Sequence, residues 1–246
     1  EAHPYFRVNS LFWDPNILGR YLAVTMVVLA AVVAYGRDRR TQIAATGAFL
    51  LILPALIATF SQSSTIALVG GVLVLVAARL GLAAGIGAGL AALVALVASL
   101  ALIGGDGLSG ESSGRSSLVD GGIEIGEDAP LQGTGSGSFA IEFEDRFGAE
   151  EGFAVESHTE PVTVFAEQGA LGLLAYAALL VVTVGGLLQA TGPRLTEPAR
   201  GSPAAAALLA VYAAMIVHSF GYAAFLTDPI TWAILGVATH LAAPGT

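Results

Sequence analysis

Seven long stretches of the chain contain almost no charged residue, and this pattern limits the folds open to it more than any other feature. An α-helix needs about 20 predominantly apolar residues to cross the hydrocarbon core of a bilayer, whereas strands of a membrane barrel are shorter and alternate in polarity. The sequence therefore predicts an all-α membrane protein, a polytopic bundle of about seven transmembrane helices. The stretches lie near residues 17–35, 42–60, 65–80, 83–103, 166–189, 204–222 and 230–243.

Composition agrees with a membrane protein. Hydrophobic residues make up 55% of the 246 residues and charged residues only 12%, and the mean hydropathy is +0.76. A soluble domain carries about 25% charged residues. Cysteine is absent, which excludes disulfides and thiolate metal sites. The first residue is Glu1 and no basic segment precedes the first apolar stretch, so we interpret the sequence as an excerpt of a longer protein.

The short connectors predict how the helices are oriented. Six of the ten arginines lie in three alternating connectors, at residues 36–40, at Arg79 and at residues 193–200. Short basic connectors stay in the cytoplasm, so the N-terminal segment, residues 61–64 and a long loop near 104–165 are expected on the opposite face. We therefore expect a multi-pass protein of the cytoplasmic (inner) membrane whose long loop is extracytoplasmic.

The long loop carries most of the negative charge. Between Asp106 and Glu167, fourteen acidic residues accompany only Arg115 and Arg146. Together with a net charge of −9, this disfavours nucleic acid as a partner. Interspersed aromatic residues indicate that the loop is partly ordered and packs, since a pure linker would lack them. They are Phe139, Phe143, Phe147 and Phe153.

These features divide the chain into three parts. Residues 1–103 are expected to hold the N-terminal segment and the first four transmembrane helices. Residues 104–165 form the acidic loop, and residues 166–246 hold the last three helices.

His158 is the first candidate for chemistry. It precedes the fifth apolar stretch in the segment Ser157-His158-Thr159-Glu160-Pro161. Ser157 and Glu160 have the spacing of a capping box, and Pro161 fits a first helical turn. His158 is thus expected at a helix N-terminus on the outer surface, where the helix dipole favours the neutral imidazole of a general base. The carboxylates of Glu156 and Glu160 act in the opposite direction and favour the imidazolium. A solvated loop histidine is the alternative interpretation.

Two arginines are further candidates, and Arg115 is one for binding an anion, because the guanidinium fork suits phosphate oxygens. Arg115 lies in an otherwise acidic segment, and Arg7 precedes Trp13 and a helix-start signal at residues 14–16. The alternatives are an ion pair of Arg115 with neighbouring carboxylates and a snorkelling role of Arg7 at the membrane surface. Arg20, just inside the first apolar stretch, fits the snorkelling role better.

Three further features complete the candidates. The glycine cluster at residues 133–137 lacks the lysine of a phosphate-binding loop and predicts a tight turn whose backbone approaches another segment closely. The acidic stretch at residues 120–128 lacks the spacing of a calcium loop, so no metal site is expected. His218 lies near the end of the sixth stretch, close to Asp228, and an ionisable residue at membrane depth is a candidate for substrate binding.

Four blocks of the sequence carry a resemblance to a known family. They are residues 7–16, Gly114-Arg115 with residues 129–139, residues 157–172, and His218 with residues 232–236. In this order they resemble the second half of the O-antigen ligase and O-antigen polymerase superfamily of membrane glycosyltransferases. One position departs from the pattern, because the family usually has Ser-Arg where this chain has Ser61-Gln62.

The resemblance implies a metal-independent and cofactor-independent glycan transfer at the extracytoplasmic face. The donor would be a glycan on a polyprenyl pyrophosphate, and the acceptor a hydroxyl of a lipid, a glycan or a protein. His158 would take the acceptor proton as general base, while Arg7 and Arg115 would hold the pyrophosphate leaving group. His218 would contribute to substrate binding.

Other functions remain open at this point. A polysaccharide polymerase of the same superfamily would use the same donor and chemistry. A non-catalytic membrane protein is the second alternative, either a transporter component or an inactive homologue. Transporters typically show charged or broken helices and internal repeats, whereas the apolar stretches have almost no charge and no evident duplication. Gln62 is the feature that favours an inactive homologue.

Overall fold

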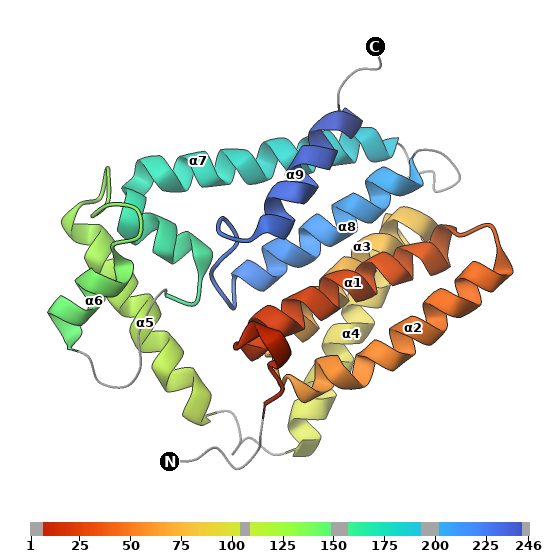
Figure 1. The fold of residues 1–246 in the computed structure, drawn as a ribbon, viewed down its shortest axis with the longest axis horizontal. Helices are drawn as coiled ribbons and strands as arrows, with labels where there is room; N and C mark the ends of the chain where they lie inside the picture. The colour runs from red at the N-terminus through yellow and green to blue at the C-terminus, as the bar shows by residue number, and fades with distance from the viewer. Residues whose placement is uncertain (1–6, 104–108, 149–156, 193–201, 243–246) are drawn as a thin grey trace. The chain divides into compact units, whose positions relative to one another are not determined.

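The computed structural model describes residues 7–103, 109–148, 157–192 and 202–242, and within these ranges the chain is helical with short connections and no strand. This confirms the all-α prediction. The elements, labelled in Figure 1, are η1 (Ser10–Phe12), α1 (Pro15–Tyr35), α2 (Arg39–Ala58), α3 (Gln62–Leu80), α4 (Leu82–Ile103), α5 (Ser109–Asp128), α6 (Phe139–Phe147), α7 (Glu160–Thr191), α8 (Pro203–Ser219) and α9 (Pro229–Ala242).

Each apolar stretch of the sequence coincides with one of these helices. Among the described residues, the four helices α1, α2, α3 and α7 are long and apolar enough to cross a membrane. The described part of α4, Leu82–Val94, and helix α8 are shorter apolar helices. The helix content therefore indicates a multi-pass membrane protein, and the count of seven spans stays a prediction.

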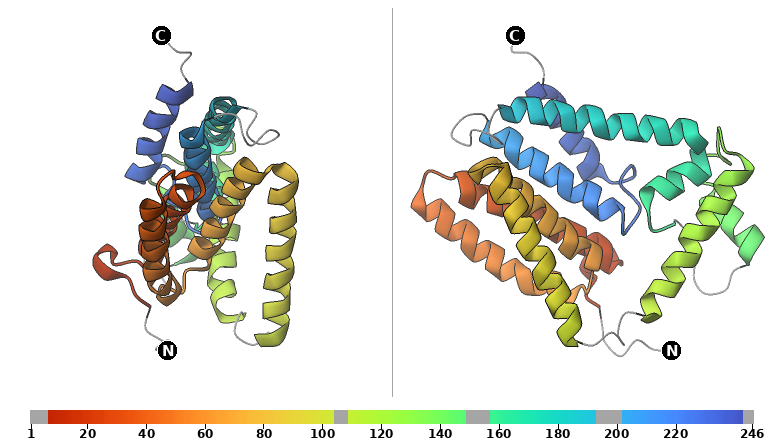
Figure 2. Two further views of the ribbon diagram at one scale, coloured as in Figure 1. Left: turned by 90° about the vertical axis from the view of Figure 1, so that its right-hand side faces the viewer. Right: turned by 180° about the vertical axis from the view of Figure 1, so that it is seen from behind.

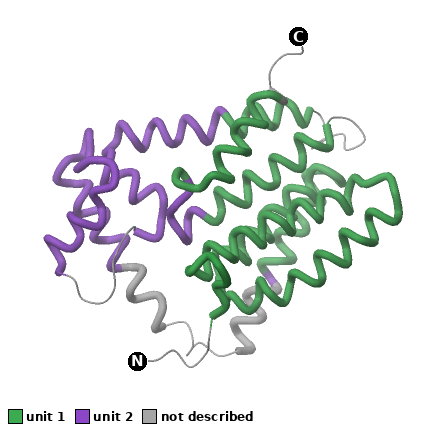
Figure 3. Tube along the Cα trace, in the orientation of Figure 1, with its two compact units in different colours: residues 1–93, 183–218, 226–246 green, residues 94–182, 219–225 purple. Residues whose placement is uncertain are grey.

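The chain forms two compact units, coloured separately in Figure 3. Unit 1 contains residues 1–93, 183–218 and 226–246, and unit 2 contains residues 94–182 and 219–225. The division of the sequence at residues 103/104 and 165/166 stays a prediction.

In unit 1, small residues bring α1, α3 and α8 close together, and α1 also packs against α2. A Cβ at Gly19 of α1 would lie 2.5 Å from the Ser64 Oγ of α3. A Cβ at Gly71 of α3 would lie 2.6 Å from a methyl carbon of Val27 in α1 and 3.2 Å from the Cβ of Ala214 in α8. Close approach through small residues is the usual way in which helices associate in a membrane.

The end of α1 is tied to its neighbours by side chains that bind its last carbonyl groups. Gln42 of α2 donates through Nε2 to the carbonyls of Val33 and Gly36, both at 3.0 Å. Arg79, in the last turn of α3, donates through Nε to the carbonyl of Ala34 at 3.2 Å. The connector at residues 36–38 and the end of α3, where the α3–α4 hairpin of Figure 2 turns, therefore share one end of unit 1.

Unit 2 has its own small apolar core. Ile125 of α5, Phe139 of α6 and Ala166 of α7 are buried against one another, with Phe143 packed beside them. The rings of Phe139 and Phe143 are stacked at 5.7 Å between centroids. Two helices thus lie within the segment expected as the acidic loop. Phe153, also expected to pack, lies outside the described residues.

Helix α7 is interrupted at Gly169, whose φ of 63° and ψ of −161° are open essentially only to glycine. The interruption frees the carbonyls of Ala166 and Glu167, which accept from the N–H groups of Thr134 and Gly135 at 3.1 and 2.8 Å. On the other side of the break, the N–H groups of residues 170 and 171 donate to the carbonyls of residues 130 and 131. The glycine cluster is therefore a turn whose backbone lies directly against another segment, as predicted.

Replacing Gly169 by alanine should destabilise unit 2, because a Cβ there would lie 2.4 Å from the carbonyl carbon of Leu131. A backbone conformation of this kind costs a non-glycine residue about 1–3 kcal/mol even before this contact is counted. Thermal unfolding in detergent and protease cleavage of the loop measure the effect. Gly185→Ala is the matched control in the same helix, since nothing lies within 4 Å of its Cβ position. Equal stability of the two variants would contradict the role given to Gly169.

Candidate functional site

The start of α1 follows from its sequence. Asp14 is the N-cap, and its carboxylate accepts hydrogen bonds from the backbone N–H groups of Asn16 and Ile17. Pro15 occupies the first helical position, where its missing N–H costs nothing. The predicted helix start is confirmed.

Arg7 lies between the start of α1 and the turn that leads into α3. Its Nε donates to the carbonyl of Thr59 at 3.0 Å, and its Nη2 reaches the Oδ1 of Asn16 at 3.4 Å and the carbonyl of Phe60 at 3.5 Å. Thr59 is fully buried, while Arg7 is half-buried. Its guanidinium is thus held between the start of α1 and the end of α2, where Thr59 is the C-cap and its carbonyl carries negative partial charge.

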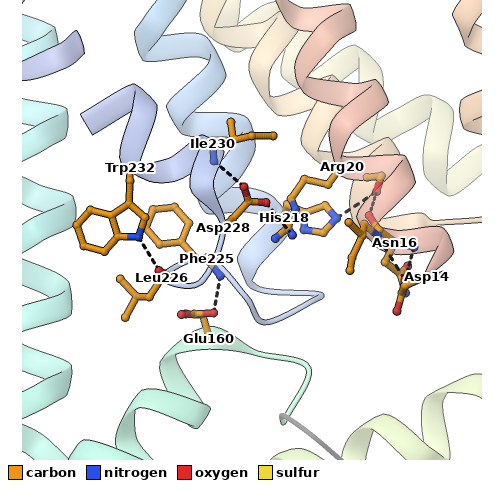
Figure 4. A network of polar contacts seen from close by, with 12 residues as sticks. Asp14, Asn16, Arg20, Glu160, His218, Phe225, Leu226, Asp228, Ile230 and Trp232 are labelled. Atoms are coloured by element: carbon orange, nitrogen blue, oxygen red, sulfur yellow. Dashed lines mark hydrogen bonds and ion pairs between the residues drawn. The ribbon is translucent and has the colours of Figure 1, made fainter. Parts of the chain in front are cut away.

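Buried serines at the start of α3 contact a histidine at the end of α8. Ser61 caps α3, and its Oγ lies 2.7 Å from the Oγ of Ser64. The Nε2 of His218 lies 3.1 Å from the Oγ of Ser64 and 3.4 Å from that of Ser63. His218 is 1% exposed, and the backbone carbonyl of Asn16 faces the same ring. Figure 4 shows His218 beside Asn16.

The snorkelling role expected for Arg20 is wrong. Arg20 is buried, and its Nη2 lies 2.8 Å from the carboxylate of Asp228 (Figure 4). The other carboxylate oxygen of Asp228 accepts from the N–H of Ile230 at 2.7 Å, so the same residue caps α9. Arg20 lies four residues after Asn16 and therefore on the same inward face of α1, which takes it away from the membrane surface.

In unit 2, His158 lies two residues before Glu160, the first residue of α7. It is half-buried, and its φ of 64° lies in the left-handed region that a side chain with a Cβ rarely adopts. The ring centroid of Tyr222 lies 6.0 Å from that of His158. Pro161 is the second residue of the helix, as predicted. A non-glycine residue in this region is held there by its surroundings, and such residues cluster at functional sites.

The predicted capping box does not form. The Oγ of Ser157 donates to the carbonyl of Thr159 at 2.8 Å and lies 2.9 Å from the Oγ1 of Thr163. The buried carboxylate of Glu160 instead accepts from the N–H of Phe225 at 2.7 Å, a contact drawn in Figure 4. The N–H of Phe225 is buried, and a buried N–H group needs an acceptor, which the Glu160 carboxylate supplies.

Residues 219–225 are bound to the start of α7 at further points within unit 2. The Oγ1 of Thr159 donates to the carbonyl of Phe220 at 3.3 Å. The hydroxyl of Tyr176 lies 3.5 Å from that of Ser219, and its ring packs edge-on against Phe225. His158 therefore lies beside a segment whose position is set by several buried contacts.

The remaining candidates are distributed between the two units. Arg7 and His218 belong to unit 1, and His158 belongs to unit 2. Arg115 lies in α5 of unit 2, and its side chain is outside the described residues. The convergence of Arg7, Arg115 and His158 on one cavity stays a prediction. Across the described ranges, no group of three or more His, Cys, Asp or Glu residues could hold a metal ion.

Sequence reasoning missed the contacts of Arg20, Asn16 and the serines at the start of α3. The contact of Arg20 could have been predicted, because an ionisable residue inside an apolar stretch needs a partner of opposite charge. Asp228 is the acidic residue at the start of the last apolar stretch. The serines gave no signal of their own, since serine is common at helix starts.

The comparison with known families also indicates a membrane protein. Long apolar helices with buried polar contacts at their ends define a multi-pass membrane protein. The sequence model of the O-antigen ligase family matches residues 25–177, more than half of the chain. The chain belongs to the O-antigen ligase family, and this membership indicates a membrane protein with glycosyltransferase-like function and lipid-linked glycan substrates. No curated protein matches the chain.

Breaking the buried ion pair from one side should destabilise unit 1 strongly. Arg20→Met leaves the Asp228 carboxylate buried without its cation, and Asp228→Asn leaves Arg20 without its anion but keeps a residue able to cap α9. Each single variant should lose about 3–5 kcal/mol. The double variant should lose less than the sum of the two.

Unfolding of the detergent-solubilised protein by increasing sodium dodecyl sulfate measures these differences. Arg40→Met is the matched control, because Arg40 is exposed and should change stability by no more than about 0.5 kcal/mol. Strict additivity of the two single variants would show that the ion pair contributes no coupling.

Proposed function

We propose that this protein transfers a glycan from a polyprenyl-pyrophosphate donor to an acceptor hydroxyl at the extracytoplasmic face of the membrane. The acceptor oxygen attacks the anomeric carbon of the donor sugar, and the bond from that carbon to the pyrophosphate breaks. The acceptor proton passes to His158, and the polyprenyl pyrophosphate leaves with its charge balanced by Arg7 and Arg115. The acceptor is a lipid, a glycan or a protein hydroxyl.

The observation that carries the proposal is the position of His158 within the matched family range. That range, residues 25–177, includes His158 and Arg115. His158 lies two residues before the first residue of α7 and is half-buried beside Tyr222, and histidine is the side chain that most often serves as a general base. Its left-handed backbone, held by the contacts of Ser157 and Thr159, supports a positioned side chain rather than a solvated one.

The surroundings of Arg7 support a role in binding the leaving group. Three acceptors fix the guanidinium, and it remains half-buried. Its contacts with the end of α2 and the start of α1 fix its position before a donor binds. Preorganised positive charge of this kind stabilises a departing pyrophosphate without having to reorganise during the reaction.

For His218 we propose an indirect role in binding the donor. Its ring is buried and contacts Ser64, whose Oγ also reaches the carbonyl of Asn16 at 3.4 Å. Asn16 in turn accepts the hydrogen bond from Arg7. His218 thus belongs to the chain of contacts that orients Arg7 toward the donor.

Two features bear on the transporter alternative. Helix α7 is broken at Gly169, and α1 carries the charge of Arg20. Arg20 lies near the start of α1, Gly169 lies near the start of the apolar part of α7, and in both cases the polar groups are paired with other parts of the chain. A transport pathway would instead present such groups to a substrate at the middle of the membrane, so the transferase remains the function we favour.

Replacing His158 should remove transfer while leaving the protein folded and inserted. Loss of a general base typically costs about 10²- to 10⁴-fold in rate. His158→Asn is the sharper variant beside His158→Ala, because asparagine tolerates a positive φ and keeps the backbone in place. Transfer is measured in proteoliposomes with a defined polyprenyl-pyrophosphate donor and candidate acceptors. His240→Asn, at an exposed position of α9, should retain activity; full activity of both His158 variants would defeat the assignment.

Arg7→Lys and Arg115→Lys should both reduce transfer, because lysine keeps the charge and loses the forked donor geometry. Loss of one hydrogen bond to a charged group is worth about 1.5–3 kcal/mol, or about 10- to 100-fold in kcat/KM. Steady-state kinetics with the same donor gives the ratio. Arg37→Lys, at an exposed position of the connector after α1, is the matched control and should be unchanged. An equal loss in Arg37→Lys would indicate a general effect of charge placement.

A further inference from the structure

An open groove of about 540 Å³ runs along the α1–α2 hairpin of unit 1, at the end away from Arg7. Its lining from α2 begins at Arg39 and Gln42 and continues through Ile43, Gly47 and Leu50, and Val33 of α1 borders it. Ile43 and Leu50 are 62% and 60% exposed. Nothing lies within 4 Å of the Cβ position of Gly47, so the groove is open at its centre.

The lining residues are ordered along the helix by chemical type. Arg39, Ile43, Gly47 and Leu50 follow one another at helical spacing and therefore lie on one face of α2. From Arg39 to Leu50 the helix advances about 16 Å at 1.5 Å per residue. This is about half of the ~30 Å hydrocarbon core, the depth of one leaflet. One cationic group at the edge is thus followed by an apolar surface as long as an acyl chain.

The charged end of the groove favours an anion. Residues 37–40 hold three arginines and one acid, Asp38. The Asp38 carboxylate caps α2 and accepts from the backbone N–H and the hydroxyl of Thr41, both at 2.9 Å. These bonds, the backbone one first, hold the pKa of the Asp38 carboxyl below its ordinary value. The carboxylate is therefore already engaged, and none of the ion pairs among the described residues involves Arg39.

We propose that this groove binds an anionic phospholipid, with the lipid phosphate on Arg39 and one acyl chain along Ile43, Gly47 and Leu50. This lipid site is separate from the proposed transfer reaction, and it lies at the opposite end of α1 from Arg7. Basic pockets between transmembrane helices are known to receive anionic lipid headgroups. In this groove, the cationic end and the apolar lining lie next to each other on one face of α2.

Charge decides between a lipid and the other possible occupants. A second copy of this chain or an apolar helix lying in the groove would cover Arg39 without supplying a counter-charge, and an unpaired buried charge is costly. A free phosphate would satisfy Arg39 but leave Ile43 and Leu50 uncovered. A phospholipid with a net negative headgroup satisfies both parts at once.

Lipid binding is tested on the full chain purified in detergent, with bound lipids counted by native mass spectrometry. The probes are phosphatidylglycerol, phosphatidylcholine and glycerol 3-phosphate. The protein should bind phosphatidylglycerol in preference to both others. Arg39→Gln should weaken this binding about tenfold or more, as expected for a lost charge-assisted contact. Gly47→Leu should abolish it while keeping or raising the melting temperature, since leucine fills the groove and favours the helix.

Two control variants distinguish a specific lipid site from general effects of charge or of an added side chain. Arg40→Gln removes the neighbouring exposed charge, which does not line the groove, and should weaken binding no more than about fivefold. Gly87→Leu places the same side chain at another open glycine, in α4, and should leave lipid binding unchanged. Equal losses in Arg39→Gln and Arg40→Gln would overturn the proposal. Unchanged binding in Gly47→Leu, displacement of the lipid by equimolar glycerol 3-phosphate, or a dimer disrupted by Gly47→Leu would overturn it equally.

Discussion

A polar or charged group inside the apolar part of a membrane protein has to find its partner within the protein, because lipid offers none. In unit 1 this requirement selects the contacts that join the helices. Arg20 and Asp228 connect the start of α1 to the start of α9, and Ser64 with His218 connects α3 to α8. The same contacts lie next to Asn16, which holds Arg7. The stability of unit 1 and the position of its candidate anion-binding group thus depend on one network.

The two ends of unit 1 hold different polar side chains. Arg7 and His218 lie at the end where α1 and α3 begin and where α2 and α8 end. The C-terminal carbonyls of α1 and α3 lie at the other end, where Arg79 and Gln42 bind them. With α1 about 30 Å long, a site for the pyrophosphate and a site for a lipid headgroup can each use a separate surface of the membrane.

How much the sequence could predict depends on whether a feature is local. The apolar stretches predicted the long helices, and residues 14–16 predicted the start of α1, because both signals lie within one continuous segment of the sequence. Helix α5 was not expected, since its glycines and serines disfavour helix. Gly121, Gly122 and Gly126 let this helix lie close to aromatic rings of α6 and α7. The Arg20–Asp228 pair and the contact of Glu160 with Phe225 join segments distant in sequence, and spacing carries no information about such partners.

The glycine cluster at residues 133–137 and the first part of α7 form one structural element. The interruption of α7 at Gly169 leaves two carbonyls and two N–H groups without helical partners, and residues 130–135 satisfy all four. Only glycine at 133 and 169 permits this distance, since a Cβ at either would lie within 2.4 Å of the opposing backbone. Glu167, beside the break, accepts from the N–H groups of Gly137 and Phe139 and so fixes the start of α6. His158 precedes the short helical segment before the break, and that segment is held by a backbone contact that no side-chain motif reveals.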